Sequence, residues 1–375
     1  MNAIGIILAG GRGDNLKELT RHRTTSALPV GSCYRAIDFP ISNMTNSGIK
    51  KIAIITQYNS RSLQDHLASA KWWNLGRKQG GLFVLAPCGL DERAMWYRGT
   101  ADSIHQNISF LKRSQEEYVV VSSGNCIFKM DLAKMLEYHI EKEADITIAY
   151  REDKAGARRY GVLVLDEHKR MTDFEEKPLD PKSSNASTGV YIMRRELLIE
   201  KMEELIGDGR YDLVRDLFAR YRKRLQIYGY PFEGHWRSIY DIRAYYDCNM
   251  EFLQSDIRKT YTFGDHVIHT KPKDEPPAKF NATATVRNSL IASGSILDGR
   301  VDNSVVFRSV RVGVDSIVTD SILMEGTKIK ENCNIEYAIL DKDVVVENGV
   351  TIKGLPNNPL IIPKGEVVTK NAIKQ

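Results

Sequence analysis

The sequence predicts an α/β domain followed by a parallel β-helix, with a proline-rich linker between them. Short β-rich apolar runs alternate with helical patterns through the first 250 residues, and this alternation is typical of a sheet covered by helices. Beyond the linker, branched aliphatic residues recur every five or six positions, as in coils that stack into a β-helix. A chain of 375 residues is long enough for two such cores.

The N-terminal domain is expected to contain at least five strands and several amphipathic helices. The candidate strands are Ile4–Leu8, Ile52–Thr56, Tyr118–Val121, Ile146–Tyr150 and Gly189–Met193. Asp131 is a suitable N-cap for a helix whose apolar residues fall on one face: Leu132, Met135, Leu136 and Ile140. A second helix is expected to bury Ile104, Ile108 and Leu111 in the same way.

The composition changes at Lys271–Lys279, where KPKDEPPAK combines three prolines with several charges. Such a segment forbids regular pairing and indicates a linker. We therefore divide the chain into residues 1–253, a linker at 254–280, and a β-helix at 281–375. The residues expected to stack inside it are Ile291, Ile296, Val301, Val306, Val312, Val318, Leu323, Ile329 and Ile335. An antiparallel sandwich would not explain so regular a spacing.

Composition and charge exclude several classes of protein. A net charge of +5 is modest for this length and argues against nucleic acid, although it suits anionic small molecules. No apolar run approaches membrane-spanning length, and Ala3–Ala9 has no basic residue before it, which favours a buried strand over a signal peptide. The five scattered cysteines lack CxxC spacing, so neither disulfides nor zinc are expected. These features favour the cytoplasm.

The first strand leads into a glycine-rich turn, which contains Leu8, Ala9, Gly10, Gly11 and Gly13. Backbone N–H groups in such a turn can hold phosphates. A purely structural turn would need the same glycines, however, and the Lys-Ser/Thr pair of a P-loop is absent. The turn alone therefore supports nucleotide binding and a structural role equally.

Five further motifs change this balance. They are Tyr34–Asn43 (YRAIDFPISN), Thr45–Ile49 (TNSGI), Trp96–Ala101 (WYRGTA), Phe174–Pro178 (FEEKP) and Tyr230–Trp236 (YPFEGHW). In this order they resemble the glucose-1-phosphate adenylyltransferases, or ADP-glucose pyrophosphorylases, over essentially the whole chain. The resemblance implies a Rossmann-like nucleotidyltransferase domain of the GT-A type, followed by a left-handed parallel β-helix. It also implies a reaction in which glucose 1-phosphate attacks the α-phosphorus of ATP, releasing pyrophosphate and ADP-glucose.

The residues that such an enzyme needs for chemistry are changed here. Family members hold Mg²⁺ with two aspartates and neutralise the triphosphate with an arginine and a lysine. At the matching positions this sequence has Asn125 and Ser238 for the aspartates, and Asn15 and Thr25 for the cations. Magnesium is normally held by carboxylates, so the resemblance implies that the metal site is lost, and we assign neither catalytic residues nor a cofactor. A bulky Tyr240 also replaces a family glycine.

Other family positions are retained. The resemblance places Tyr97, Gly161, Glu176, Lys177 and Ser187 around glucose 1-phosphate, although Glu175–Pro178 by itself would read as an exposed charged turn. It also places Arg23 and Arg35 where family members bind anionic allosteric effectors between the domains. Arginine suits bidentate phosphate binding, but surface charge or subunit contacts explain these residues equally well. His22 replaces a basic residue there, which leaves the identity of the effector open.

The favoured hypothesis is a catalytically impaired regulatory subunit, most like that of bacterial glycogen biosynthesis. It would join a catalytic ADP-glucose pyrophosphorylase subunit in a heterotetramer, or form a homo-oligomer alone, and respond to glucose 1-phosphate, ATP or phosphorylated effectors. The alternatives are an active nucleotidyltransferase with altered metal ligation or substrate, and a stand-alone sugar-phosphate sensor. An acyltransferase is disfavoured because all eight histidines precede the repeats, the last being His269.

Overall fold

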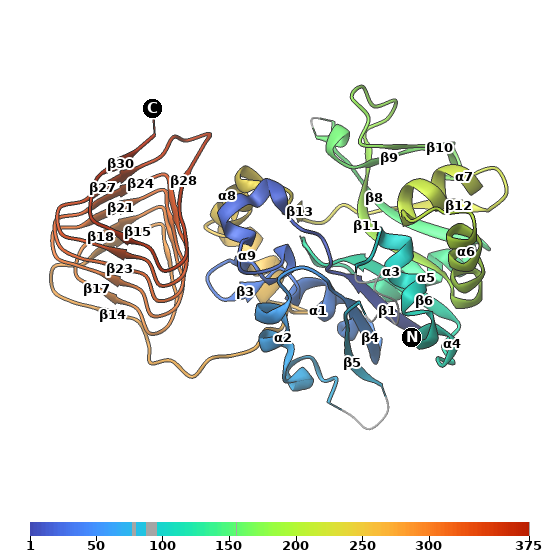
Figure 1. The fold of residues 1–375 in the computed structure, drawn as a ribbon, viewed down its shortest axis with the longest axis horizontal. Helices are drawn as coiled ribbons and strands as arrows, with labels where there is room; N and C mark the ends of the chain where they lie inside the picture. Colours follow the sequence, from blue (N-terminus) through green and yellow to red (C-terminus); the bar gives the residue numbers. More distant parts are fainter. Residues whose placement is uncertain (77–79, 88–95, 155, 375) are drawn as a thin grey trace.

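The N-terminal domain is built on a nine-stranded mixed sheet in the computed structural model, which describes residues 1–76, 80–87, 96–154 and 156–374 (Figure 1). Its strands follow the order β10-β9-β11-β6-β1-β4-β5, and β8 pairs with β11 and β12. Their bounds are β1 (Ala3–Leu8), β4 (Lys51–Ile55), β5 (Gly81–Leu85), β6 (Tyr118–Ser123), β8 (Ile146–Glu152), β9 (Gly161–Leu165), β10 (Met171–Glu176), β11 (Asn185–Arg194) and β12 (Ile227–Pro231). All five predicted strands are thus confirmed.

The centre of this sheet is parallel, because β1 pairs in parallel with both β4 and β6, whereas β11 runs antiparallel to β6. Two short pairs lie outside it, β2 (Pro29–Val30) with β3 (Tyr34–Arg35), and β7 (Cys126–Phe128) with β13 (Trp236–Ser238). The helices are α1 (Asp38–Asn46), α2 (Arg61–Leu67), α3 (Thr100–Gln106), α4 (Ile108–Lys112), α5 (Leu132–Glu141), α6 (Arg195–Gly207), α7 (Ala219–Tyr221), α8 (Ile242–Glu251) and α9 (Ser255–Thr262). None of these helices is long and apolar enough to cross a bilayer.

Helix α5 confirms the predicted cap and corrects the predicted buried face. The Asp131 carboxylate accepts from the backbone N–H of Ala133 at 3.0 Å, as an N-cap should. In the last turn, however, Ile140 is 52% exposed and His139 is buried. The imidazole Nδ1 of His139 lies 2.8 Å from the Thr147 hydroxyl, so a polar side chain, hydrogen-bonded through one ring nitrogen, takes the inward position that we expected for Ile140.

The C-terminal domain is a left-handed parallel β-helix with three sheets (Figure 1). The first holds β14 (Lys279–Phe280), β17 (Ile296–Leu297), β20 (Arg311–Val312), β23 (Lys328–Ile329), β26 (Val345–Val346) and β29 (Val367–Val368). The second holds β15 (Thr285–Arg287), β18 (Arg300–Asp302), β21 (Ile317–Thr319), β24 (Asn334–Glu336), β27 (Thr351–Lys353) and β30 (Ala372–Ile373). The third holds β16 (Leu290–Ile291), β19 (Val305–Val306), β22 (Ile322–Leu323), β25 (Ala338–Leu340) and β28 (Leu360–Ile362).

The strand register corrects one residue of the predicted inner stack. Ile296 lies in register with the exposed Arg311, whereas Leu297 lies in register with the buried Val312. Leu297 is itself fully buried. Since successive side chains in a strand point to opposite faces, Leu297 and not Ile296 belongs to the inner stack at this coil.

The third sheet of the β-helix packs on the N-terminal domain. Its outward residues Val305, Ile322 and Ile339 share one apolar cluster with residues of α8 and α9, and Figure 1 shows α8 on the side of the domain that faces the β-helix. Helix α9 lies within the segment 254–280 that we assigned to the linker, whereas residues 267–278 form neither helix nor strand. Helix α9 therefore belongs to the interdomain core, and β14 at the end of the segment belongs to the β-helix.

Candidate functional site

The main candidate site is a cavity of about 390 Å³ at the carboxyl ends of three parallel strands. The last residues of β1, β4 and β6, namely Leu8, Ile55 and Ser123, all line it. Here the parallel strands give way to antiparallel β11. A crevice at the carboxyl ends of strands, next to a change in sheet topology, is where α/β folds bind ligands.

The glycine-rich turn forms one wall of this cavity through Ala9, Gly10 and Gly11. The backbone N–H of Ala9 donates to the carbonyl of Ile55 at 2.8 Å, which fixes the start of the turn against β4. Gly13 does not line the cavity. It has a φ of 69°, and a Cβ there would lie 2.5 Å from the Thr25 hydroxyl, so glycine is required by backbone conformation and close packing.

The two positions where the resemblance implies cations bring no charge into the cavity. Thr25 is buried and lines the cavity, but its side chain is neutral. Asn15 is exposed and is not among the lining residues. Our sequence analysis missed two cations that do line the wall, Arg12 and Arg98. The motif WYRGTA contained Arg98 and could have indicated it.

Neither of these two arginines is fully available to a ligand. The guanidinium of Arg12 lies 5.6 Å from the centre of the Tyr58 ring and 3.3 Å from the Asp14 carboxylate. Arg98 donates to the Asp102 carboxylate at 3.0 Å and stacks 3.8 Å from the Tyr211 ring centre. The charge of Arg98 is thus already paired within the protein.

The two positions where the resemblance implies metal ligands lie side by side. Strand β13 pairs with β7 so that Ser238 lies opposite Cys126, the residue after Asn125. The amide Nδ2 of Asn125 donates to the carbonyl of Ile239 at 3.0 Å, and the backbone N–H of Ile239 donates back to the Asn125 carbonyl at the same distance. Asn125 also lines the cavity.

This donor set does not fit magnesium. Asn125 and Ser238 offer one amide and one hydroxyl, both neutral, and Mg²⁺ in proteins is bound through carboxylates. Across the described residues, no cluster of three or more histidine, cysteine, aspartate or glutamate side chains is arranged to hold a metal ion. Cys33, Cys126, Cys248 and Cys333 are free thiols, and Cys88 lies outside the described residues.

Tyr240 follows Ser238 by two residues and packs on the turn before β9. Its hydroxyl accepts a hydrogen bond from Arg159, whose guanidinium lies 5.1 Å from the Tyr240 ring centre. The ring also contacts Tyr160, with centroids 6.0 Å apart. The side chain that replaces a family glycine is therefore held in place by the turn before β9.

The five residues expected around the sugar phosphate fall in two groups. Tyr97 lines the cavity and its hydroxyl accepts from the Asn107 amide at 2.9 Å. Ser187 is buried behind the cavity wall and lies 3.5 Å from the hydroxyl of Tyr191, which does line the cavity. Gly161 and Glu176 are paired across β9 and β10. None of Gly161, Glu176, Lys177 and Ser187 is among the lining residues.

Glu176 and Lys177 form an adjacent charged pair. The Lys177 ammonium lies 3.6 Å from the Glu176 carboxylate, and the Lys177 side chain is 67% exposed. Burial raises the pKa of Glu176, and the neighbouring ammonium partly offsets this. Gly161 leaves room for the pair, because a Cβ at this position would collide with the Phe174 ring and approach the Glu176 carboxylate to 3.1 Å.

Comparisons with known proteins match both domains. The nucleotidyl transferase family model matches residues 4–255, and the model of the GlmU-like C-terminal hexapeptide family matches residues 276–357. The glucose-1-phosphate adenylyltransferases of Bacillus cereus strain Q1 and Bacillus anthracis are 38% identical to this chain over 359 residues, which is 93% of this chain and 94% of each relative. That of Bacillus mycoides strain KBAB4 is 37% identical over the same length.

This chain belongs to the glucose-1-phosphate adenylyltransferase family. Its identity to these enzymes spans both domains, so the resemblance of the five motifs reflects membership and not a shared fold alone.

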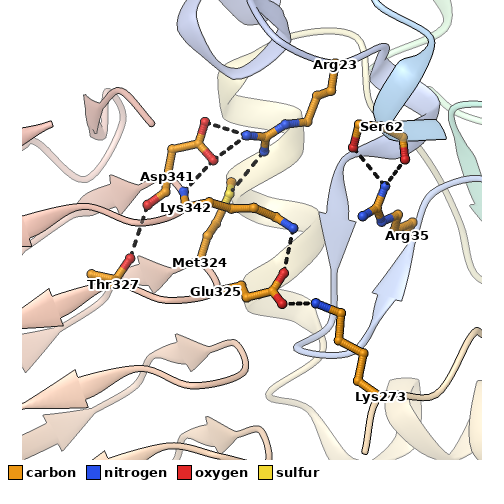
Figure 2. Close-up of polar contacts among 9 residues, drawn as sticks. All are labelled: Arg23, Arg35, Ser62, Lys273, Met324, Glu325, Thr327, Asp341 and Lys342. Carbon is orange, nitrogen blue, oxygen red and sulfur yellow. Dashed lines mark hydrogen bonds and ion pairs between the residues drawn. The ribbon is translucent and has the colours of Figure 1, made fainter. Parts of the chain in front are cut away.

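A second cavity of this family member, of about 230 Å³, lies between its two domains. Arg35 lines it and donates to the carbonyl and hydroxyl oxygens of Ser62 at 2.6 and 3.0 Å. Arg23 does not line it. Instead both carboxylate oxygens of Asp341 accept from one nitrogen of the buried Arg23 guanidinium, at 2.7 and 2.8 Å (Figure 2). The two arginines that we predicted as effector ligands thus have different partners.

Proposed function

We propose that this chain is a regulatory, catalytically impaired subunit of ADP-glucose pyrophosphorylase in glycogen biosynthesis. One observation carries the proposal: the strand-end cavity is walled by the glycine turn, while Thr25 and Asn125 in its lining, and Ser238 opposite Cys126, offer none of the charges that the reaction needs. In this proposal the chain holds no magnesium of its own and works in the cytoplasm.

The expected loss of activity is large. Losing one well-placed electrostatic contact typically lowers a rate by about 10²–10³, or roughly 3–4 kcal/mol. Two metal carboxylates and two cations act on the same transition state, so their losses are coupled and do not simply add. Even a partial sum leaves the isolated chain with little turnover, which is why a partner must supply the chemistry.

The proposed partner is a catalytic ADP-glucose pyrophosphorylase subunit, joined in a heterotetramer. The β-helix exposes large apolar side chains, including Phe280, Ile317 and Val367, which contact with another subunit would cover. The retained Tyr97, Glu176 and Lys177 support a role in binding glucose 1-phosphate, and the interdomain cations support binding of phosphorylated effectors.

The test is co-purification with activity measurement. The chain is expressed alone and with a catalytic family member, and ADP-glucose formation from ATP and glucose 1-phosphate is measured at several magnesium concentrations. We expect near-background turnover alone, a stable complex, and altered kcat or effector response of the catalytic subunit.

Two other outcomes would replace this proposal. Robust turnover by the isolated chain would favour the active enzyme with altered metal ligation, which the 38% identity to catalytic relatives also supports. Absence of both complex and kinetic effect, together with calorimetric binding of glucose 1-phosphate, would favour a stand-alone sugar-phosphate sensor.

A further inference from the structure

The interdomain cavity is strongly cationic. Three parts of the chain contribute to it: Arg35 from β3, Lys271 and Lys273 from residues 267–278, called the extended segment below, and Arg308 and Lys342 from the β-helix. The acids that line the same cavity are Asp65 and Glu325. Five cations against two carboxylates leave an excess of positive charge, which a compact anion would balance.

Glu325 already occupies two of these cations. One carboxylate oxygen pairs with the Lys273 ammonium and the other accepts from the Lys342 ammonium at 2.6 Å. Figure 2 shows the carboxylate between the two lysines, one from the extended segment and one from the β-helix. A carboxylate that bridges two ammonium groups takes the place that two oxygens of a bound phosphate would take.

The remaining cations of the cavity are less fully paired. Arg35 donates to Ser62 and the Lys271 ammonium donates to the carbonyl of Asp65 at 3.0 Å, so both have neutral partners. The Arg308 guanidinium makes no hydrogen bond or ion pair with any residue in the described ranges. The Arg308 guanidinium can therefore bind an anion without first breaking a hydrogen bond or ion pair with another described residue.

The lysines that Glu325 bridges are crowded. Burial lowers the pKa of Lys342 to about 7, with Arg35 and Arg23 as neighbouring cations that lower it further. Burial, Lys342 and Arg308 likewise lower the pKa of Lys273 to about 8. Because these cations repel one another, a nearby negative charge stabilises their protonated forms, whether it belongs to the protein or to a ligand.

We propose that Glu325 is a built-in competitor for oxyanions in this cavity. Its carboxylate holds Lys273 and Lys342 until a ligand bearing phosphate or a similar group displaces it, and Arg308 and Arg35 offer that ligand its first contacts. This inference deepens the effector binding included in the proposed function. In this proposal the Glu325 carboxylate raises the ligand concentration that is needed to occupy the cavity.

The test measures sulfate binding by isothermal titration calorimetry at constant ionic strength. Sulfate keeps a constant charge near neutral pH and carries no nucleotide or sugar. Glu325→Gln should bind sulfate roughly tenfold more tightly than the wild-type chain, which corresponds to one charge-assisted contact released for the ligand. Adding Arg308→Gln should remove this gain, which locates the sulfate in the cavity.

The matched control is Glu347→Gln, whose carboxylate pairs with Lys330 at 2.6 Å on the outside of the β-helix. It should leave sulfate binding unchanged. Equal or weaker sulfate binding by Glu325→Gln, or a gain that persists with Arg308→Gln, would overturn the proposal. If Glu325→Gln does not fold, Glu325→Asp replaces it, because the shorter chain cannot span both lysines; an affinity equal to the wild-type value then overturns the proposal.

These titrations use the isolated chain and no catalytic partner. Failure of the competitor proposal therefore leaves the co-purification and activity results unaffected. Failure of the regulatory proposal equally leaves the sulfate titrations interpretable.

Discussion

The two cavities of this molecule differ in what surrounds them. The strand-end cavity is lined by neutral side chains, such as Thr25 and Asn125, at positions where the resemblance implies charge. The interdomain cavity is lined by five cations and bridged by a glutamate. The contrast teaches that one fold can hold a cavity with neutral side chains at key positions beside another that is rich in charge.

The neutral side chain of Asn125 is compatible with the fold because it satisfies a neighbouring backbone group. The Asn125 amide donates to the Ile239 carbonyl, so the turn between β6 and β7 needs no metal ion to hold it. The buried ion pair of Arg23 and Asp341 between the domains does not tolerate such a replacement. Removing one member of a buried ion pair leaves the other charge without a partner, which is costly.

The largest expected effect follows from this difference. Arg23→Ala should lower the free energy of unfolding by about 3–5 kcal/mol, because the buried Asp341 carboxylate would lose both of its contacts with the guanidinium. Urea denaturation measures the change. Lys330→Ala, which breaks the exposed pair with Glu347, should cost about 1 kcal/mol or less. Equal losses in the two variants would contradict the contrast between buried and exposed pairs.

The second prediction concerns a variant that restores charged side chains at the four changed family positions. Asn15→Arg, Thr25→Lys, Asn125→Asp and Ser238→Asp together should raise ADP-glucose formation by about 10²–10³ over the starting chain. We expect activity to stay below that of a catalytic relative, because Tyr240 remains fixed by Arg159 beside the restored carboxylates.

The measurement is ADP-glucose formation with ATP, glucose 1-phosphate and magnesium. Circular dichroism and glucose 1-phosphate binding are the controls for folding and for the sugar site. Undetectable turnover in a folded variant that binds the sugar would mean that the strand-end cavity lacks more than these four residues.

The sequence predicted local features of both cavities and missed their long-range pairs. The period of the aliphatic residues predicted the β-helix, but strand register decided that Leu297 and not Ile296 lies inside. Motif positions indicated Arg23 and Arg35 as one anion site. Only the packing of the two domains shows that Arg23 forms an ion pair with Asp341, which lies 318 residues further along the chain.

The same limitation applies to Glu325. Nothing in the repeat pattern distinguishes it from other acids at β-helix corners, because its partner Lys273 lies in the extended segment before the first coil. Local spacing describes which side chains share a strand or helix face. It carries no information about which corner of the β-helix meets the linker.

The smallest expected effect is a pH dependence confined to the charged cavity. Sulfate affinity should fall roughly tenfold as the pH rises from about 6 to about 9, because Lys342, with a pKa of about 7, and Lys273, with a pKa of about 8, lose their protons in turn. A bound anion favours the protonated lysines, so binding takes up protons and is tightest at low pH. The charged groups that act on these two lysines are Arg23, Arg35, Arg308, Lys364, Glu275, Glu325 and Asp341.

Calorimetry with sulfate at constant ionic strength measures this profile, and Lys342→Met is the control. In that variant the fall near pH 7 should disappear, and the fall caused by Lys273 should move to higher pH, because Lys342 no longer lowers the pKa of Lys273. A flat profile in the wild-type chain would mean that the sulfate binds away from the two lysines. Because Thr25 and Asn125 do not titrate in this range, a sulfate held in the strand-end cavity by these residues would give that flat profile, and the pH dependence therefore tells the two cavities apart.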